Sequence, residues 1–238
     1  MSPFNYFTFD GKSSRDFGIY ISGDGVFNAP ERDMSAVSVP GRSGDLYYDN
    51  KRFKNVKLKY SAGIVKDFDR SMTDFRGFML SRPGYCRLED TYHPDEFREA
   101  IFLGPIDVTP SVLKAGKFDV LFNCKPQRFL KSGETPIGIT EKTTIRNQTY
   151  YSAKPFLRIY GYGTLEIGNN TITVASASEA PYIDIDCETM NAYYGDSNLN
   201  SKISVNSEDF PALAPGETVI TPASTISRVE LIPRWWTV

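Results

Sequence analysis

The sequence has few of the residues with which enzymes and metal proteins do their chemistry. It contains a single histidine, His93, and three cysteines that are far apart, Cys86, Cys124 and Cys187. One histidine cannot form a multi-histidine metal site, and an odd number of cysteines without a C-x-x-C pair indicates neither a disulfide framework nor a zinc knuckle. The patterns G-x-S-x-G and H-E-x-x-H and the EF-hand loop are also missing. We therefore expect no enzymatic activity, no cofactor and no tightly bound metal.

Long apolar runs and an excess of charge are missing too. No run approaches the about 18 apolar residues of a membrane-spanning helix, and residues 1–14 lack the basic and apolar regions of a signal peptide. We expect a chain without a membrane partner that folds in a reducing cytoplasm. The formal net charge of −2 provides no general attraction for nucleic acid. A basic run at 51–59 with interleaved aromatic residues could clamp a single strand, but its alternation favours a solvated or protein-facing surface.

Aromatic residues and turn formers, by contrast, are abundant. The 238 residues include 16 Phe, 14 Tyr, 18 Gly and 15 Pro, a mixture typical of β structure with many turns. Apolar residues alternate with polar ones in 53–65 and 182–189, which predicts strands, and "GTLEIGNNTITVAS" (163–176) predicts a hairpin. One helix is predicted near 68–82, where four apolar residues fall on one stripe that can cover a sheet. They are Phe68, Met72, Phe75 and Met79.

The segment "KSGETPIGITE" (131–141) is short, polar and broken by Gly and Pro, which indicates a domain boundary. We expect an N-terminal domain of residues 1–134, mainly β with one covering helix. Residues 135–238 contain short strands separated by turns, which favours an antiparallel β-sandwich.

The stretch "SVPGRSGDLYYDN" (38–50) is the one loop with a composition that could bind a phosphate. Gly41 and Gly44 flank Arg42, with Pro40 before them and Tyr47 and Tyr48 after them. A P-loop needs G-x-x-x-x-G-K-[ST], and a dinucleotide loop needs G-x-G-x-x-G before a helix. The two glycines are too close together, and the residues that follow have the composition of a strand. The pattern therefore favours a turn between two strands.

Two further groups of side chains could act chemically. His93 could be a general base oriented by Asp90, Asp95 or Glu96, but it precedes a proline in a predicted turn, which favours an exposed histidine. Carboxylates at 184, 186 and 188 alternate along a predicted strand, so neighbours lie about 6.5–7 Å apart, as in some glycosidase pairs. Calcium could also bind there. An ordinary sheet with one solvated face also explains Asp184, Asp186 and Glu188, and we favour it over a ligand site.

The order of several segments points to a family. The chain opens with "FTFDGKSSRDFGIYIS" (7–22) and "VPGRSGDL" (39–46), and "GKFDVLFNCKPQRFL" (116–130) ends its first half. The second half contains, in order, "KPFLRIYGYGTLEIGNNTITV", "YIDIDCETMNAYYG", "FPALAPGETVI" and "PRWW". In this order and spacing, the sequence resembles the distal tail proteins (Dit) of long-tailed, non-contractile bacteriophages over nearly its whole length.

That resemblance implies a structural protein at the virion tail tip. Six copies would form a ring through the N-terminal domain, and the C-terminal domain would be a galectin-like sandwich that contacts peripheral parts. One ring face would meet the tail tube protein and the other the tail-tip spike protein, with a receptor-binding protein as a further partner. DNA would only pass through the channel, without specific binding. No long insertion that could act as an arm for receptor-binding proteins is present.

Under this hypothesis the loop at 38–50 serves assembly. Pro40, Gly41 and Gly44 set a defined backbone, Arg42 offers several donors to a neighbour's carboxylate, and the tyrosine pair supplies contact area. Two other hypotheses remain open at this point. One is a carbohydrate-binding module that uses tyrosines as stacking platforms, and the other is an enzyme that uses the carboxylates of 184–188. The tyrosines concerned are Tyr160, Tyr162, Tyr193 and Tyr194.

Overall fold

The computed structural model describes residues 4–23, 25, 27–64, 68–106, 108–110, 116–176 and 180–238. The chain folds into two compact units, residues 1–128 with Val238 and residues 129–237. Both units are mainly β and antiparallel, and α1 (Phe68–Leu80) is the one α-helix in the described part. The prediction of a mainly β chain with one covering helix is confirmed.

The first unit is built on one twisted antiparallel sheet. Its path runs β2-β1-β7-β8-β10-β6-β3, and β9 pairs with β10. The strands are β1 (Phe7–Phe9), β2 (Lys12–Ser13), β3 (Ile19–Ser22), β6 (Val56–Ile64), β7 (Cys86–Asp90), β8 (Glu96–Phe102), β9 (Val108–Pro110) and β10 (Gly116–Cys124). A 3₁₀ turn, Ser14–Phe17, links β2 to β3.

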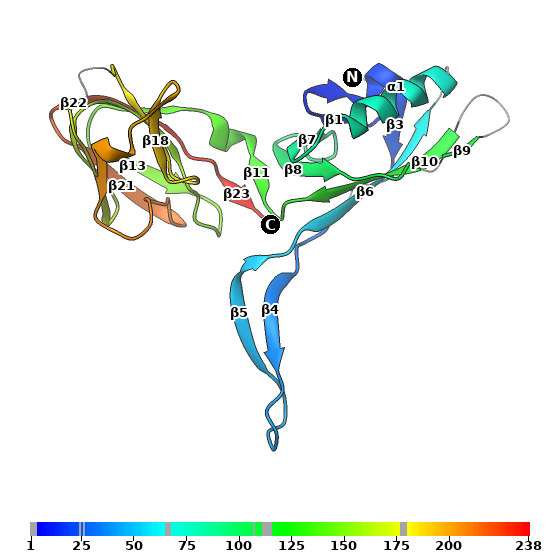
Figure 1. Ribbon diagram of the computed structural model, residues 1–238, viewed down its shortest axis with the longest axis horizontal. Coiled ribbons are helices and arrows are strands. Elements are labelled where there is room, and N and C mark those ends of the chain that lie inside the picture. The colour runs from blue at the N-terminus through cyan, green and yellow to red at the C-terminus, as the bar shows by residue number, and fades with distance from the viewer. Residues whose placement is uncertain are drawn as a thin grey trace. The chain divides into compact units, whose positions relative to one another are not determined.

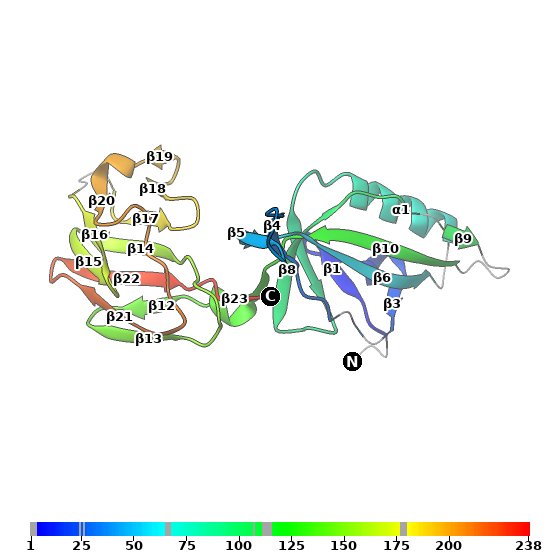
Figure 2. The same cartoon turned by 90° about the horizontal axis from the view of Figure 1, so that it is seen from below.

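Helix α1 covers one face of this sheet (Figures 1 and 2). The predicted apolar stripe is the reason, because Met72, Phe75 and Met79 are buried and Phe68 is partly buried. The ring of Phe75 lies 5.5 Å from that of Phe17, and the rings of Phe118 and Phe7 in the sheet lie 6.1 and 6.3 Å away. Burial alternates along β6 and β10, so every second side chain of these strands enters this core. The opposite face of the same strands is left to solvent.

The strands β4 (Arg32–Val37) and β5 (Leu46–Phe53) form a separate two-stranded sheet. This hairpin (blue in Figure 1) belongs to the first unit and extends away from the sheet that α1 covers. The sequence predicted a strand after Gly44, and β5 confirms this prediction.

The second unit is a sandwich of two antiparallel sheets. One has the order β12-β22-β14-β17-β18-β19, and the other β13-β21-β15-β16-β20. The strands of the first sheet are β12 (Ile137–Ile139), β14 (Phe156–Gly161), β17 (Ile183–Asp186), β18 (Asn191–Tyr194), β19 (Ser197–Asn198) and β22 (Ile226–Ile232). Those of the second are β13 (Thr143–Asn147), β15 (Gly163–Ile167), β16 (Asn170–Val174), β20 (Ile203–Val205) and β21 (Gly216–Pro222). The apolar residues of both sheets form one buried cluster, and the predicted hairpin at 163–176 is present as β15 and β16.

Residues 131–141, where we predicted a domain boundary, are ordered parts of the second unit. Lys131–Glu134 forms a 3₁₀ turn after β11 (Arg128–Leu130), and β12 follows it. Gly133 packs so closely that an added Cβ would lie 2.3 Å from the backbone nitrogen of Trp235. Its carbonyl accepts a 2.9 Å hydrogen bond from the N–H of Arg234, and β23 (Trp236–Thr237) pairs with β11. Independent folding of 1–134 and 135–238 stays a prediction.

Replacing Phe75 by Ala should destabilise the first unit by about 3–5 kcal/mol, because a buried aromatic side chain is lost and leaves a cavity. Leu80→Ala on the same helix is the control, since Leu80 is exposed and should change stability by less than about 0.5 kcal/mol. Urea unfolding followed by circular dichroism measures both. Equal effects of the two variants would show that α1 does not pack as described.

Candidate functional site

The six residues predicted to mediate assembly lie together at the tip of the β4–β5 hairpin. Residues 38–45 form the turn, which the N–H of Arg42 closes with a 3.1 Å hydrogen bond to the carbonyl of Val39. Gly41 and Gly44 have φ values of 80° and 84°. Residues with a Cβ atom rarely adopt these values, so the turn needs both glycines. Pro40 precedes them, and the two tyrosines follow Leu46, the first residue of β5.

The outer half of this hairpin exposes apolar side chains on both of its faces. Tyr47 and Tyr48 are 62% and 67% exposed, and consecutive strand residues point to opposite faces. Across the ladder, Tyr47 faces Ala36 and Leu46 faces Val37. Further exposed apolar residues of the hairpin are Met34, Val37, Val39 and Leu46. A two-stranded hairpin alone is marginally stable in water, and exposed apolar surface of this kind is typical of protein interaction sites.

The inner half of the hairpin is charged and internally paired. Arg32 lies 2.7 Å from Asp49, Arg52 lies 2.6 Å from Asp33, and Lys54 lies 2.9 Å from Glu31. The hydrogen bond from Arg52 lowers the pKa of Asp33 below its ordinary value. Three of the five basic residues in the run at 51–59, Arg52, Lys54 and Lys59, thus pair with carboxylates. At the tip, by contrast, neither Arg42 nor Asp45 has an ion-pair partner within the described chain.

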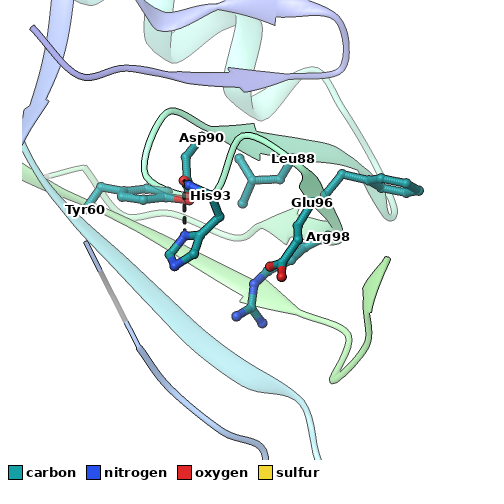
Figure 3. A pocket seen from close by; sticks show the side chains of 7 residues that line it. Tyr60, Leu88, Asp90, His93, Glu96 and Arg98 are labelled. Carbon is teal, nitrogen blue, oxygen red and sulfur yellow. Dashed lines mark hydrogen bonds and ion pairs between the residues drawn. The ribbon is translucent and has the colours of Figure 1, made fainter. Parts of the chain in front are cut away.

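His93 is not exposed, contrary to our prediction. The turn after β7 folds inward because the Asp90 Oδ1 accepts hydrogen bonds from the backbone N–H groups of Tyr92 and His93, at 2.9 and 2.8 Å. The imidazole Nδ1 also lies 3.3 Å from this oxygen, and the hydroxyl of Tyr60 donates to Oδ2 at 2.6 Å. Figure 3 shows these side chains converging on Asp90. The carboxylate holds the turn in place.

Arg98 of β8 lies in the same cluster and is only 9% exposed. Burial lowers its pKa, and its Nη2 donates a 3.1 Å hydrogen bond to the Oδ1 of Asn28. Asn28 in turn donates to the carbonyl of Lys57 at 3.1 Å, so this chain of contacts ties the segment before β4 to β8 and β6. The cavity between Arg98 and His93 has a volume of about 10 Å³, which accommodates about one water molecule. It offers no room for a substrate beside His93.

Asp184 and Asp186 do not form the solvated sheet face that we favoured, so that interpretation was wrong, and both carboxylates are paired with arginines. Strand β17 ends at Asp186, and Glu188 lies in the following turn. Asp184 is only 5% exposed and accepts from the Nε and Nη2 of Arg158 at 2.7 and 2.9 Å. Asp186 accepts from Arg234 at 2.7 and 3.1 Å. Each of these two aspartates is therefore neutralised by an arginine that no sequence spacing indicated.

Two of the four tyrosines proposed as sugar platforms, Tyr160 and Tyr194, pack on a neighbouring ring. Tyr182 lies between the rings of Tyr160 and Tyr194, at centroid distances of 5.5 and 4.9 Å. The guanidinium of Arg158 stacks 4.2 Å from the Tyr182 ring. Tyr162 is half-exposed and stands beside a cavity of about 90 Å³. No group of three or more His, Cys, Asp or Glu side chains suited to a metal is found among the described residues, and no described helix is long and apolar enough to cross a membrane.

The fold and the hairpin together define a mainly β protein with an exposed apolar tip on a two-stranded hairpin of its first unit. No known family model matches the sequence, and no curated protein matches it either. Among solved structures it is similar to the Dit protein of phage SPP1, whose structure is described as a paradigm of the hub adsorption apparatus in phages that infect Gram-positive bacteria. The TM-score is 0.70 at 12% identity, over 98% of this chain and 99% of that one. The chain therefore has the fold of a distal tail protein, as its sequence predicted.

Replacing Arg158 by Met should destabilise the second unit by about 3–5 kcal/mol, because it leaves the buried Asp184 without its cation. Adding Asp184→Leu should restore most of that stability, since an apolar pair of similar size needs no compensating charge. Chemical unfolding of the wild type and both variants measures this. If the double variant is no more stable than Arg158→Met, the buried charge is not the cause of the loss.

Acid should weaken the second unit partly through Asp186. Burial would raise the pKa of this carboxyl, but the bonds and charge of Arg234 outweigh it, so the folded-state pKa lies below the ordinary value. Its stabilisation is present above an unfolded pKa of about 3.9 and is lost as the pH falls through the folded value. Thermal melts between pH 7 and 2 should show a smaller acid loss for Asp186→Asn than for wild type. Glu188→Gln, at an exposed position, should keep the wild-type profile.

Proposed function

We propose that this protein is a structural hub of a phage tail tip. Six copies form a ring through residues 1–134, whose one face meets the tail tube protein and whose other face meets the tail-tip spike protein. The galectin-like sandwich of residues 135–238 lies at the periphery, where it contacts a receptor-binding protein. The chain is made in the bacterial cytoplasm and ends in the virion tail tip, and DNA passes through the ring without being bound specifically.

The observation that carries this proposal is the likeness to SPP1 Dit over practically the whole of both chains. The likeness includes both units, so it favours a shared architecture rather than one common domain. The hairpin tip gives the proposal a physical basis, because its exposed tyrosines need a partner surface. A net charge of −2 also suits a channel for DNA, since a strongly basic lining would bind phosphates and retain the passing molecule.

Within the ring, Arg42 is proposed to pair with a carboxylate of the neighbouring subunit. Its guanidinium can donate two parallel hydrogen bonds to one carboxylate. If the pair is covered on assembly, removing the arginine leaves a charge without a partner at every interface.

Light scattering coupled to size exclusion tests the ring. Wild type should have a mass of 160.8 kDa, six times the chain mass of 26.8 kDa. Arg42→Ala should lose about 2–5 kcal/mol per interface and shift the population toward the 26.8 kDa monomer. Circular dichroism should stay unchanged, because Arg42 has no fold contact beyond the turn.

Arg70→Ala is the matched control, since Arg70 is an exposed arginine on α1 far from the hairpin in sequence. It should leave the hexamer intact. A wild type that stays at 26.8 kDa at every concentration tested would count against the ring. A hexamer that tolerates Arg42→Ala would remove the role given to this side chain and leave the ring itself in place.

A further inference from the structure

The outer face of the first sheet, opposite α1, contains a groove with a small-residue floor. In β6, Gly63 stands between Tyr20 of β3 and Lys117 of β10 in the strand register. One row further, Ser61 stands between Ser22 and Asp119. The groove has a volume of about 630 Å³. We call it the Gly63 groove.

One wall of the Gly63 groove is aromatic and exposed. Phe4 is 59% exposed, and its ring lies 5.3 Å from that of Tyr20. The chain before β1 reaches this position because the carbonyl of Asn5 accepts a 2.9 Å hydrogen bond from the N–H of Ile21. An exposed pair of aromatic rings next to a glycine forms a surface on which another flat side chain can pack.

The other wall is polar and carries one uncompensated charge. Asp119 is matched, because it lies 2.7 Å from Lys59 and accepts a 3.0 Å hydrogen bond from the hydroxyl of Ser61. These contacts lower the pKa of Asp119, the hydrogen bond from Lys59 most of all. Lys117, in contrast, is exposed and has no ion pair within the described chain. The groove therefore presents a positive charge to whatever fills it.

We propose that the Gly63 groove receives the tip of the β4–β5 hairpin of a second copy of this chain. The inference deepens the proposed ring and rests on it, because it names the surface that the hairpin contacts on the neighbouring subunit. The occupant is a second copy because the tip supplies what the groove lacks: two exposed tyrosine rings and the unpaired carboxylate of Asp45. A tyrosine fits over Gly63 against Phe4 and Tyr20, and Asp45 pairs with Lys117.

The arrangement of the two surfaces also fits ring closure. The hairpin leaves the sheet at the Val56 end of β6 and extends away from it (Figure 1), so it does not cover the groove of its own chain. Each chain thus carries two different complementary surfaces. A contact between unlike surfaces repeats head to tail and closes into a ring when the rotation allows it.

Gly63→Phe tests the groove directly. Gly63 lacks the positive φ that only glycine tolerates, and an added Cβ would approach only the carbonyl oxygen of Gly116, at 3.9 Å. A phenylalanine should therefore fill the groove without disturbing the fold, and aromatic residues favour strands more than glycine does. We expect the mass to fall from the hexamer to 26.8 kDa, with a melting temperature no lower than that of wild type.

Mixing two variants tests the pairing of groove and hairpin. Tyr47→Ser/Tyr48→Ser lacks the inserting rings but keeps its groove, whereas Gly63→Phe keeps its hairpin but lacks a groove. Each variant alone should be a monomer. Their equimolar mixture should stop at a heterodimer of 53.6 kDa, twice 26.8 kDa, because one intact interface remains per pair. A mixture that stays monomeric would overturn the assignment.

A charge exchange checks the polar wall. Lys117→Glu should weaken the ring, and adding Asp45→Lys should restore it, because the proposed pair is then reversed. Lys57→Glu is the matched control, since Lys57 is exposed on the same face of β6 but lies outside the groove. If Lys117→Glu and Lys57→Glu weaken the ring equally, the effect is general charge and not this contact.

The experiments separate the two proposals. A wild-type hexamer that tolerates Gly63→Phe would overturn the groove and leave the ring in place. A wild type that is monomeric at all concentrations would overturn both.

Discussion

The packing of α1 on one face of the first sheet is the interaction on which the rest of this unit depends. Phe75 is fully buried among the rings of the sheet, and it determines which alternate side chains of β6 and β10 form the core. The remaining side chains of the same strands must then face outward. The small floor at Ser61 and Gly63 and the aromatic wall at Phe4 are exposed as a direct consequence.

The hairpin presents the opposite situation, because within the described residues of the first unit its apolar tip is exposed. Its inner half is held by three ion pairs, and the chain from Arg98 through Asn28 to Lys57 fixes the segment that leads into it. A buried polar group without its hydrogen-bond partner costs free energy. The hydrogen bonds between Arg98, Asn28 and Lys57 therefore favour one defined position of this segment. The hairpin therefore has an exposed apolar tip and an inner half fixed by ion pairs. This combination suits the proposed insertion of the tip into a neighbouring subunit.

In the second unit, the two aspartates that we considered as ligands form ion pairs with arginines. Asp184 and Asp186 lie on alternate positions of β17 where a ligand site was conceivable, yet arginines from β14 and from the chain before β23 neutralise them. Removing either arginine would leave a largely buried carboxylate without its cation, whereas the pair itself contributes little net stability. Among the tyrosines proposed for sugar binding, Tyr162 is half-exposed.

The sequence by itself determined the elements whose cause is local. The spacing of Met72, Phe75 and Met79 predicted α1, alternation predicted β6 and β17, and Gly41 and Gly44 predicted the turn between β4 and β5. The order of motifs also predicted the fold, which the likeness to SPP1 Dit confirms. Each of these signals is carried by residues within one segment or by their order along the chain.

Only the tertiary structure decided which of these side chains meet. Sequence spacing could not show that Arg158 reaches Asp184, that His93 turns inward, that Gly133 packs on Trp235, or that Gly63 lies in an open groove. A consecutive pair such as Tyr47 and Tyr48 could have signalled a strand with two apolar faces, but its exposure depends on what covers the hairpin. Burial and pairing arise between segments distant along the chain, because the free energy of a charge or an apolar ring depends on its surroundings in space.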